Sequence, residues 1–187
     1  MNKIKIECPC LIKNFDYHKE IKQNLLNLIN QSNYSPLNDP GCETDITKTD
    51  WHLSKDFNRP WVKYLSNFLL DPMLQIYKDL GYDGYTLHEL WFQQYEQLSG
   101  HGWHTHSANF TNVYYLDMPD DAPKIQIVNA YNQVEIVELD VKEGDIVVFP
   151  SFVIHRSPKN LSNNKKTIIS FNTNITYSNK IYGQGLK

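Results

Sequence analysis

The sequence predicts a mostly β fold, a sandwich or barrel supported by N-terminal helices, in one domain over residues 1–187. Two observations predict it. Apolar residues recur at helical spacing only within residues 1–84, whereas strand-like segments and turns alternate from Tyr85 onward. Composition agrees, because 187 residues with 41% apolar and 13% aromatic side chains can bury a substantial core. We therefore divide the chain into a supporting part, residues 1–84, and a β core, residues 85–178.

The supporting part begins with residues 3–12, where polar and apolar side chains alternate as in a strand. Asp16 can then cap a helix over residues 17–31, in which apolar residues recur at helical spacing. Residues 33–58 are polar and rich in turns. They predict a long loop, and a loop of this kind is a candidate lid over a binding site.

A second helix is expected over residues 60–80. Proline lacks a backbone N–H, so Pro72 is expected to split this helix in two. Its apolar side chains share one face and predict a buried stripe of Trp61, Leu65, Phe68 and Leu69.

Eight short strands are expected in the β core, because Gly, Asp, Pro and Asn punctuate it at regular spacing. The expected strands span residues 85–97, 103–106, 110–117, 124–129, 134–140, 146–149, 153–156 and 166–176. No internal repeat or low-complexity tract interrupts this pattern.

Charge and cysteine usage restrict the partners and the compartment. The formal net charge of −3 gives no general attraction to nucleic acid or to an anionic membrane. No positively charged leader starts the sequence, and no apolar run approaches the length that spans a bilayer. The cysteines Cys8, Cys10 and Cys42 lack zinc-ribbon spacing. We therefore expect a cytoplasmic protein without a membrane partner; the charge does not favour nucleic acid but leaves room for a local basic face, and the sequence leaves the oligomeric state open.

Three histidines in the β core predict a metal site. His104 and His106 are separated by one residue on an expected strand, so their side chains point to the same face of the sheet. His155 follows a second strand about fifty positions later and can complete a facial three-ligand site with open coordination positions. Imidazole binds iron, zinc, copper and nickel, so these residues alone predict a site and leave the metal open.

Longer motifs surround these histidines in a consistent order. They are Trp-His-Thr-His at 103–106, Val-Tyr-Tyr-Leu at 113–116, Gly-Asp-Ile-Val-Val-Phe-Pro-Ser at 144–151, then His155, Pro158 and Asn160, and Lys-Thr-Ile-Ile-Ser-Phe-Asn at 166–172. Together they resemble the 2-oxoglutarate/Fe(II) oxygenase family, relatives of the prolyl hydroxylases. The resemblance implies a double-stranded β-helix (a jelly roll like that of the cupins). It also implies Fe(II) held by His104, His106 and His155, with 2-oxoglutarate and O2 as co-substrates.

The resemblance also implies residues that bind 2-oxoglutarate. Lys166 stands where the family places an arginine before its last core strand, so it is expected to pair with the C5 carboxylate. Lys165 is the rival, because a shift of one residue exchanges the two faces of a strand. Further side chains on the neighbouring strands are candidates for the same site, or for ordinary packing: Gln93, Tyr95, Tyr114, Ser170 and Asn172.

Two positions depart from the family pattern. The family's first motif is H-x-D or H-x-E, whereas this chain has His104-Thr105-His106, so a neutral imidazole replaces a carboxylate. A site of three imidazoles still binds divalent iron, with a different potential and metal selectivity. Lys166 in place of arginine keeps the positive charge but loses the bidentate fork.

We therefore expect an enzyme, a dioxygenase that hydroxylates its substrate while 2-oxoglutarate is converted to succinate and CO2. The alternatives are a cupin-type metalloenzyme that does without 2-oxoglutarate and a non-catalytic β-sandwich binding module. The cupin alternative lacks the glutamate that usually follows the H-x-H pair, since residues 110 and 111 are Phe and Thr. The substrate stays open, and small molecules and peptidyl groups are both compatible with the sequence.

Overall fold

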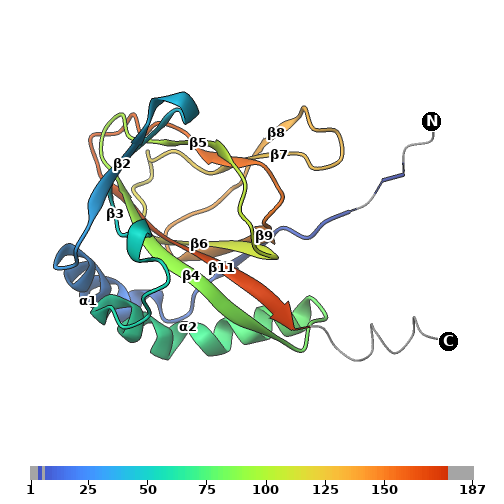
Figure 1. Ribbon diagram of the computed structural model, residues 1–187, viewed down its shortest axis with the longest axis horizontal. Helices are drawn as coiled ribbons and strands as arrows, with labels where there is room; N and C mark the ends of the chain where they lie inside the picture. Colours follow the sequence, from blue (N-terminus) through green and yellow to red (C-terminus); the bar gives the residue numbers. More distant parts are fainter. Residues whose placement is uncertain (1–3, 6, 177–187) are drawn as a thin grey trace.

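The computed structural model describes residues 4, 5 and 7–176, and its strands form two antiparallel sheets that face each other (Figure 1). The larger sheet contains β1 (Leu11–Asn14), β2 (Ser35–Asp39), β3 (Thr44–Thr49), β4 (Gly84–Tyr95), β6 (Phe110–Asp117), β9 (Asp145–Pro150) and β11 (Lys166–Thr176). The smaller sheet contains β5 (His101–His104), β7 (Gln126–Val128), β8 (Ile136–Glu138) and β10 (His155–Ser157). Their orders are β1-β9-β6-β11-β4-β3-β2 and β5-β10-β7-β8.

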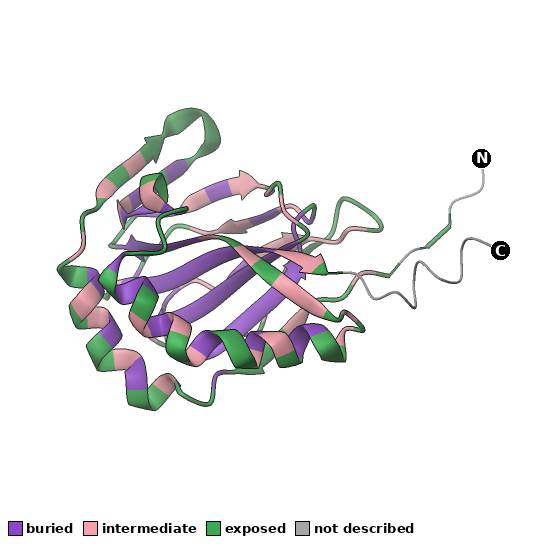
Figure 2. Cartoon of the chain, turned by 60° about the horizontal axis from the view of Figure 1, so that its bottom comes forward, coloured by how far each residue is buried: buried purple, intermediate pink, exposed green. Residues whose placement is uncertain are grey.

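Two helices, α1 (His18–Asn30) and α2 (Pro60–Asp79), cover the outer face of the larger sheet, and their buried sides face it (Figure 2). The reason is the two-residue period of a strand, which gives one row of apolar side chains to the helices and the other to the space between the sheets. In β11, Ile169 and Phe171 pack in the helix-side core, whereas Ile168 packs between the sheets. Among the described residues, neither helix combines the length and hydropathy needed to cross a bilayer.

The eight strands expected in the β core are all present. The expected bounds of β6 and β11 agree with the structure at both ends. The other strands differ from the expected bounds by a few residues, as in β5, which ends at His104 instead of His106. Strand ends depend on pairing with a neighbour, and the local pattern does not record where that pairing stops.

The supporting part differs from the expectation in its loop. Residues 33–58, expected as a long loop, contain β2, the short 3₁₀ helix η1 (Pro40–Cys42), β3 and a second 3₁₀ helix, η2 (Trp51–Leu53). β3 pairs with β4, and β2 pairs with β3, so this segment extends the larger sheet. The segment lies at the edge of the sheet, where strands are held by hydrogen bonds to a neighbour and do not need a fully apolar face. Its side chains can therefore be polar.

The strand expected over residues 3–12 is also wrong in its bounds: β1 begins at Leu11, and the described residues before it form no strand, while residues 1–3 and 6 lie outside the described part. Asp16 makes no cap, because α1 begins one residue later with Tyr17 at its N-cap position and no side-chain cap bond. Pro72 does not split α2, which is continuous from Pro60 to Asp79.

The continuity of α2 has a packing explanation. Leu65 and Leu69 before the proline and Met73 and Ile76 after it are all buried in the helix-side core. Both halves therefore lie on one sheet face, and burial of this stripe offsets the single hydrogen bond that Pro72 cannot make. Of the expected stripe, Trp61, Leu65 and Leu69 are buried and Phe68 is partly buried.

Candidate metal centre

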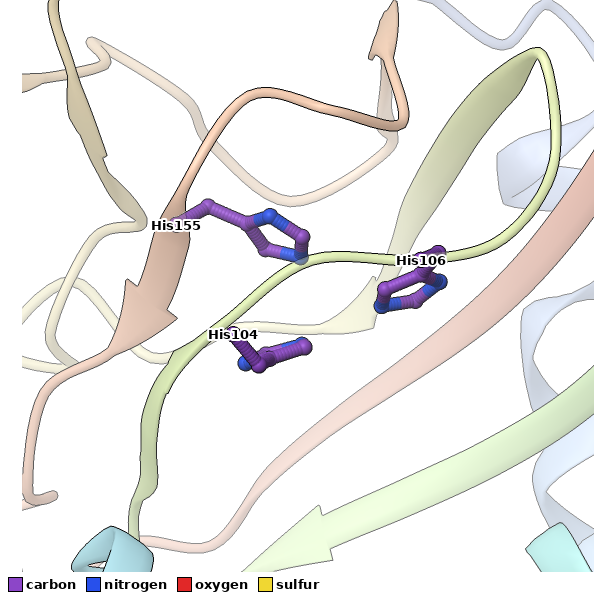
Figure 3. A group of neighbouring side chains, drawn as sticks. All are labelled: His104, His106 and His155. Carbon is purple, nitrogen blue, oxygen red and sulfur yellow. The ribbon is translucent and has the colours of Figure 1, made fainter.

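His104, His106 and His155 come together between the sheets, and their imidazole rings point toward one another (Figure 3). His104 is the last residue of β5 and His155 the first of β10, and the two residues are direct partners in the antiparallel register. His106 lies two residues beyond β5, where its backbone N–H donates to the Ser151 carbonyl at 3.0 Å. One ligand atom from each histidine lies within 4.8 Å of the others, so a single ion can contact all three.

Hydrogen bonds fix which ring nitrogen of each histidine faces the cavity. His155 Nδ1 lies 2.9 Å from the Val153 carbonyl, and His104 Nδ1 lies 2.7 Å from the Gly102 carbonyl. A carbonyl only accepts, so both Nδ1 atoms must carry the proton, and both Nε2 atoms keep a free lone pair. His106 Nδ1 lies 2.7 Å from Asn172 Oδ1, which places the same demand on it.

Burial keeps these rings neutral. It lowers the pKa of His104 to about 4, and it lowers the pKa values of His106 and His155 as well. A neutral imidazole with a free Nε2 is the form that binds a metal. Orientation and protonation therefore both fit a divalent transition-metal ion, Fe(II) among them.

A close backbone approach holds β5 in place. A Cβ atom built on Gly102 would lie 1.6 Å from the Cys42 carbonyl oxygen, so no larger residue fits there without movement of the chain. Gly102 N–H also donates to Thr44 Oγ1 at 3.2 Å. The segment expected as a loop thus forms the wall against which the first histidine strand packs.

Four of the candidate co-substrate residues lie together. Lys166, Tyr95, Gln93 and Ser170 line one pocket together with the three histidines. Lys166 is 1% exposed and points into this pocket, whereas Lys165 precedes β11, is only partly buried and does not line the pocket.

The surroundings of Lys166 suit an anion. Its Nζ donates to Ser157 Oγ at 2.8 Å and to the Pro123 carbonyl at 2.9 Å, and it lies 4.9 Å from the centre of the Tyr95 ring. An ammonium has three N–H groups, so one is left for a ligand. Burial lowers the pKa of Lys166 to about 7, because no carboxylate partner balances its charge.

The structure contradicts the expectation that Tyr114 lies in the co-substrate site. Its hydroxyl lies 2.7 Å from His18 Nδ1 in α1, and its ring packs in the helix-side core. Tyr115 lines the pocket instead. The two faces of β6 are both rich in large side chains, so the sequence pattern did not reveal which one turns toward the helices.

Asn172 also differs from its expected contact. Its side chain lies beside the metal cluster, bonded to His106, and it does not line the Lys166 pocket. Its amide nitrogen donates to Glu89 Oε2 at 2.7 Å. Glu89 was missed in the sequence, although it shares the inward face of β4 with Trp91, Gln93 and Tyr95 by simple alternation.

His101 is the second residue that the sequence did not reveal. It belongs to β5, and its ring stacks on His104 with 3.7 Å between the ring centres. Its Nδ1 lies 3.4 Å from Gln93 Nε2. His101 therefore covers one side of the first metal-binding ring.

An open groove of about 660 Å³ leads from the surface to the histidines. Its walls are largely aromatic and polar, and they include Trp51, Trp91, Trp103, Asp39 and Glu89. Leu37, Cys42 and Thr44 complete the side formed by residues 33–58. The groove and the Lys166 pocket meet at His101, His104 and His106, which line both.

The chain is similar to known proteins both in sequence and in structure. Residues 89–172 match the family model described as "Putative 2OG-Fe(II) oxygenase". Among curated proteins no significant sequence match is found. The matched segment runs from Glu89 to Asn172 and contains all three histidines and Lys166.

Three solved structures are similar to the chain over most of its length. A 2OG-Fe(II) oxygenase family oxidoreductase from Burkholderia pseudomallei has a TM-score of 0.72 at 14% identity, covering 88% of this chain and 84% of that one. A prolyl hydroxylase from Trichoplax adhaerens, in complex with a hypoxia-inducible-factor peptide fragment, has a TM-score of 0.63 at 18% identity, with coverages of 95% and 87%. A non-heme α-ketoglutarate-dependent carbocyclase from nogalamycin biosynthesis has a TM-score of 0.66 at 12% identity, with coverages of 91% and 80%. These likenesses confirm the predicted double-stranded β-helix.

Proposed function

We propose that this chain is a 2OG-Fe(II) oxygenase, which hydroxylates a small-molecule or peptidyl substrate with Fe(II), 2-oxoglutarate and O2. One observation carries the proposal. Three histidines with free Nε2 atoms and a buried, carboxylate-free lysine line the same pocket. A metal site alone would be compatible with many enzymes, whereas the added cation matches a co-substrate with a distal carboxylate.

In this proposal His104, His106 and His155 hold the metal. Fe(II) bound there, together with 2-oxoglutarate and O2, supplies the oxidising power for attack on a substrate C–H bond. The protein's part is to hold the ligands in one protonation state, to keep open coordination positions and to exclude bulk water. The buried Nδ1 bonds of the three histidines serve the first of these roles.

Lys166 is proposed to hold the C5 carboxylate. Its Nζ is bonded to Ser157, which lies two residues beyond His155 in β10. Two residues advance a strand by roughly 6–7 Å, a span that a five-carbon dicarboxylate can bridge between a metal and an ammonium. Ser170 and Gln93, bonded to each other at 3.1 Å, lie on the wall between these two ends and offer polar groups to the chain of the co-substrate.

The groove lined by Trp51, Trp91 and Trp103 is proposed to admit the substrate. Its opening to solvent is compatible with a free small molecule and with a side chain on a peptide. The similar structures include a peptide-bound hydroxylase and a carbocyclase, so the fold leaves the reaction type open. Hydroxylation is proposed because it is the reaction that needs no further group beyond the metal, the two co-substrates and a bound C–H bond.

An anaerobic titration tests the proposal. Metal-free protein is loaded with Fe(II), then with 2-oxoglutarate, and the absorption spectrum is recorded. We expect a new band near the visible range that requires both additions and is absent in His155→Ala. Metal binding without such a band would instead favour the cupin-type alternative, and binding of neither would favour a non-catalytic module.

A second measurement addresses the reaction. Succinate release is followed in air across panels of free amino acids, peptides, nucleobases and small metabolites. We expect release that depends on Fe(II) and increases with one class of substrate, with one added oxygen atom in the product by mass spectrometry. A product of unchanged oxygen content would contradict hydroxylation while leaving the family assignment in place.

A further inference from the structure

The Glu89 carboxylate is connected to the three histidines through the side-chain amide of Asn172. Glu89 Oε2 accepts a hydrogen bond from Asn172 Nδ2 at 2.7 Å, and Asn172 Oδ1 lies 2.7 Å from His106 Nδ1. Glu89 and Asn172 are direct partners in the register of β4 and β11, and a register shift follows immediately at Asn172/Thr173. Bulges of this kind re-aim side chains near sites, so the pairing is a built feature of the two strands.

The chain of hydrogen bonds from Glu89 through Asn172 to His106 has only one consistent set of proton positions. An ionised carboxylate only accepts, so Glu89 must face the amide N–H₂ of Asn172. The Asn172 oxygen is thereby turned toward His106, whose Nδ1 must donate to it. The proton of His106 then lies on Nδ1, and Nε2 is free for a metal. A glutamine at position 89 could donate as well as accept, so it would no longer enforce this order.

The negative charge of Glu89 gives this chain of hydrogen bonds a second consequence. The family pattern places a carboxylate at the position of His106, whereas this chain offers three imidazoles and no carboxylate in the ligand set. The Glu89 carboxylate lies two hydrogen bonds from His106 Nδ1, which donates to Asn172 Oδ1, while Asn172 Nδ2 donates to Glu89 Oε2. Negative charge two hydrogen bonds away therefore reaches this ring and increases its strength as a donor to a metal.

Other charges near Glu89 do not replace this contact. Lys55 Nζ lies 3.7 Å from Glu89 Oε1, but its side chain is 69% exposed, so solvent screens the pair. Asp39, the other carboxylate on the walls of the groove, accepts from Gly41 N at 3.1 Å and is exposed.

We propose that Glu89 is a positioning residue of the metal centre, which acts through Asn172 to fix the tautomer of His106 and to supply the negative charge that the ligand set lacks. The inference rests on the proposed function, because it assumes that the three histidines hold a metal. It explains how a three-histidine site retains an anionic influence without a carboxylate ligand.

The first test is a Co(II) titration of metal-free full-length protein, followed by the d–d absorption of the bound ion. We expect Glu89→Gln to weaken Co(II) binding about 10–100-fold, the usual effect of removing a partner of a metal-bound histidine. The matched control is Asp39→Asn, which removes a carboxylate from the same groove and keeps a capping side chain. It is expected to change the affinity less than about twofold; an equal loss in both variants would overturn the inference in favour of a general field effect.

The second test reads the tautomer directly. Nitrogen-15 NMR of the histidine rings in metal-free protein at neutral pH is expected to show His106 as a single Nδ1–H tautomer. In Glu89→Gln we expect a mixture of the two tautomers, with His104 and His155 unchanged. An unaltered His106 signal in a folded variant, judged by its thermal unfolding curve, would contradict the proposal.

A double-mutant cycle distinguishes an effect of Glu89 through Asn172 and His106 from a structural role of Glu89. His106→Asp restores the carboxylate that the family pattern has, so Glu89 should no longer matter there. We expect Glu89→Gln to change the Co(II) affinity of the His106→Asp protein less than about twofold. A loss as large as in the parent protein would show that Glu89 acts by some other route. If the parent protein binds no Co(II), the proposed function fails; if it binds and Glu89→Gln binds equally well, this inference alone fails.

Discussion

At the scale of single residues, Lys166 shows how position changes chemistry. A lysine on the surface would keep its usual pKa, but burial at the end of β11 lowers the pKa of Lys166 to about 7. Its two neutral acceptors, Ser157 Oγ and the Pro123 carbonyl, stabilise the ammonium only in part. The cost of this buried charge is expected to be recovered when a carboxylate binds.

Replacement of Lys166 tests its role toward the co-substrate. Lys166→Met keeps the apolar length of the side chain and removes the charge. We expect the apparent requirement for 2-oxoglutarate to rise about thirtyfold or more, on the order of 2–5 kcal/mol, with Fe(II) affinity nearly unchanged. Isothermal titration under argon measures both quantities: Fe(II) is titrated into metal-free protein, and 2-oxoglutarate is then titrated into the Fe(II)-loaded protein.

Lys165→Met is the matched control, since Lys165 is only partly buried and does not line the pocket. It is expected to bind 2-oxoglutarate as the parent protein does. If Lys165→Met were the damaging change and Lys166→Met silent, the assignment of the anchor would be wrong by one residue. If neither mattered, the co-substrate site would lie elsewhere.

The lowered pKa of Lys166 also predicts how stability depends on pH. Between pH 7 and about 10.5 the unfolded chain carries a proton on this lysine that the folded chain lacks, so the free energy of unfolding rises with pH in this window. Relative to Lys166→Met, the parent protein should gain about 2–3 kcal/mol from pH 7 to pH 9. Urea unfolding at both pH values measures this, and parallel curves for the two proteins would contradict it.

At the scale of elements, the site depends on how β5 packs against residues 33–58. β5 has only four residues, too few to be stable by pairing alone. It is fixed on one side by β10, through the His104–His155 pair, and on the other by the contact of Gly102 with Cys42. The position of His104, the first candidate metal ligand, therefore depends on the segment that was expected to be a long loop.

A methyl group at position 102 tests this dependence. In Gly102→Ala the new Cβ would overlap the Cys42 carbonyl, so β5 or η1 must move. We expect a loss of about 1–3 kcal/mol in the free energy of unfolding and at least tenfold weaker Co(II) binding. Thermal unfolding and metal titration on the same preparation give both values.

Gly84→Ala provides the comparison, because its new Cβ would lie 3.8 Å from Thr176, an ordinary van der Waals distance. This variant is expected to match the parent protein in Co(II) affinity. Equal metal binding in Gly102→Ala and the parent protein would mean that β5 does not need its close approach to η1.

At the scale of the whole molecule, the metal centre lies between two sheets with different support. The larger sheet is covered by both helices, and its core strands are buried on both faces. The smaller sheet has short strands, and two of its four, β5 and β10, carry or adjoin the three candidate metal ligands. An ion bound there cross-links these strands in the folded state only.

Metal binding should therefore raise the thermal stability of the molecule. At a free ion concentration a hundredfold above the dissociation constant, linkage gives about 2.7 kcal/mol. For a domain of this size that corresponds to about 5–10 °C in Tm. Differential scanning calorimetry with Co(II) measures the shift, which a chelator should abolish. His155→Ala is expected to show no shift, and a shift of the same size in this variant would place the stabilising ion elsewhere.

Local pattern determined a large part of this protein. Turn residues between the expected strands predicted both ends of β6 and β11, and the helical spacing in residues 60–80 predicted α2 and most of its buried stripe. The H-x-H pair and His155 predicted that these three histidines converge, because side chains on adjacent strands need only the right alternation to meet. These features are encoded by neighbours in the chain, so the sequence alone carries them.

Only the tertiary structure decided which face of each strand turns inward. A strand offers two faces at equal cost to its backbone, and the packing of the helices selects one. Tyr114 thus lies against α1 and Tyr115 lines the pocket, while Lys166 points inward and Lys165 does not. The same packing keeps α2 continuous through Pro72, pairs β3 with β4, and brings Glu89 to Asn172 across 83 residues. Such contacts join distant segments, and their energies exist only once the sheets have formed.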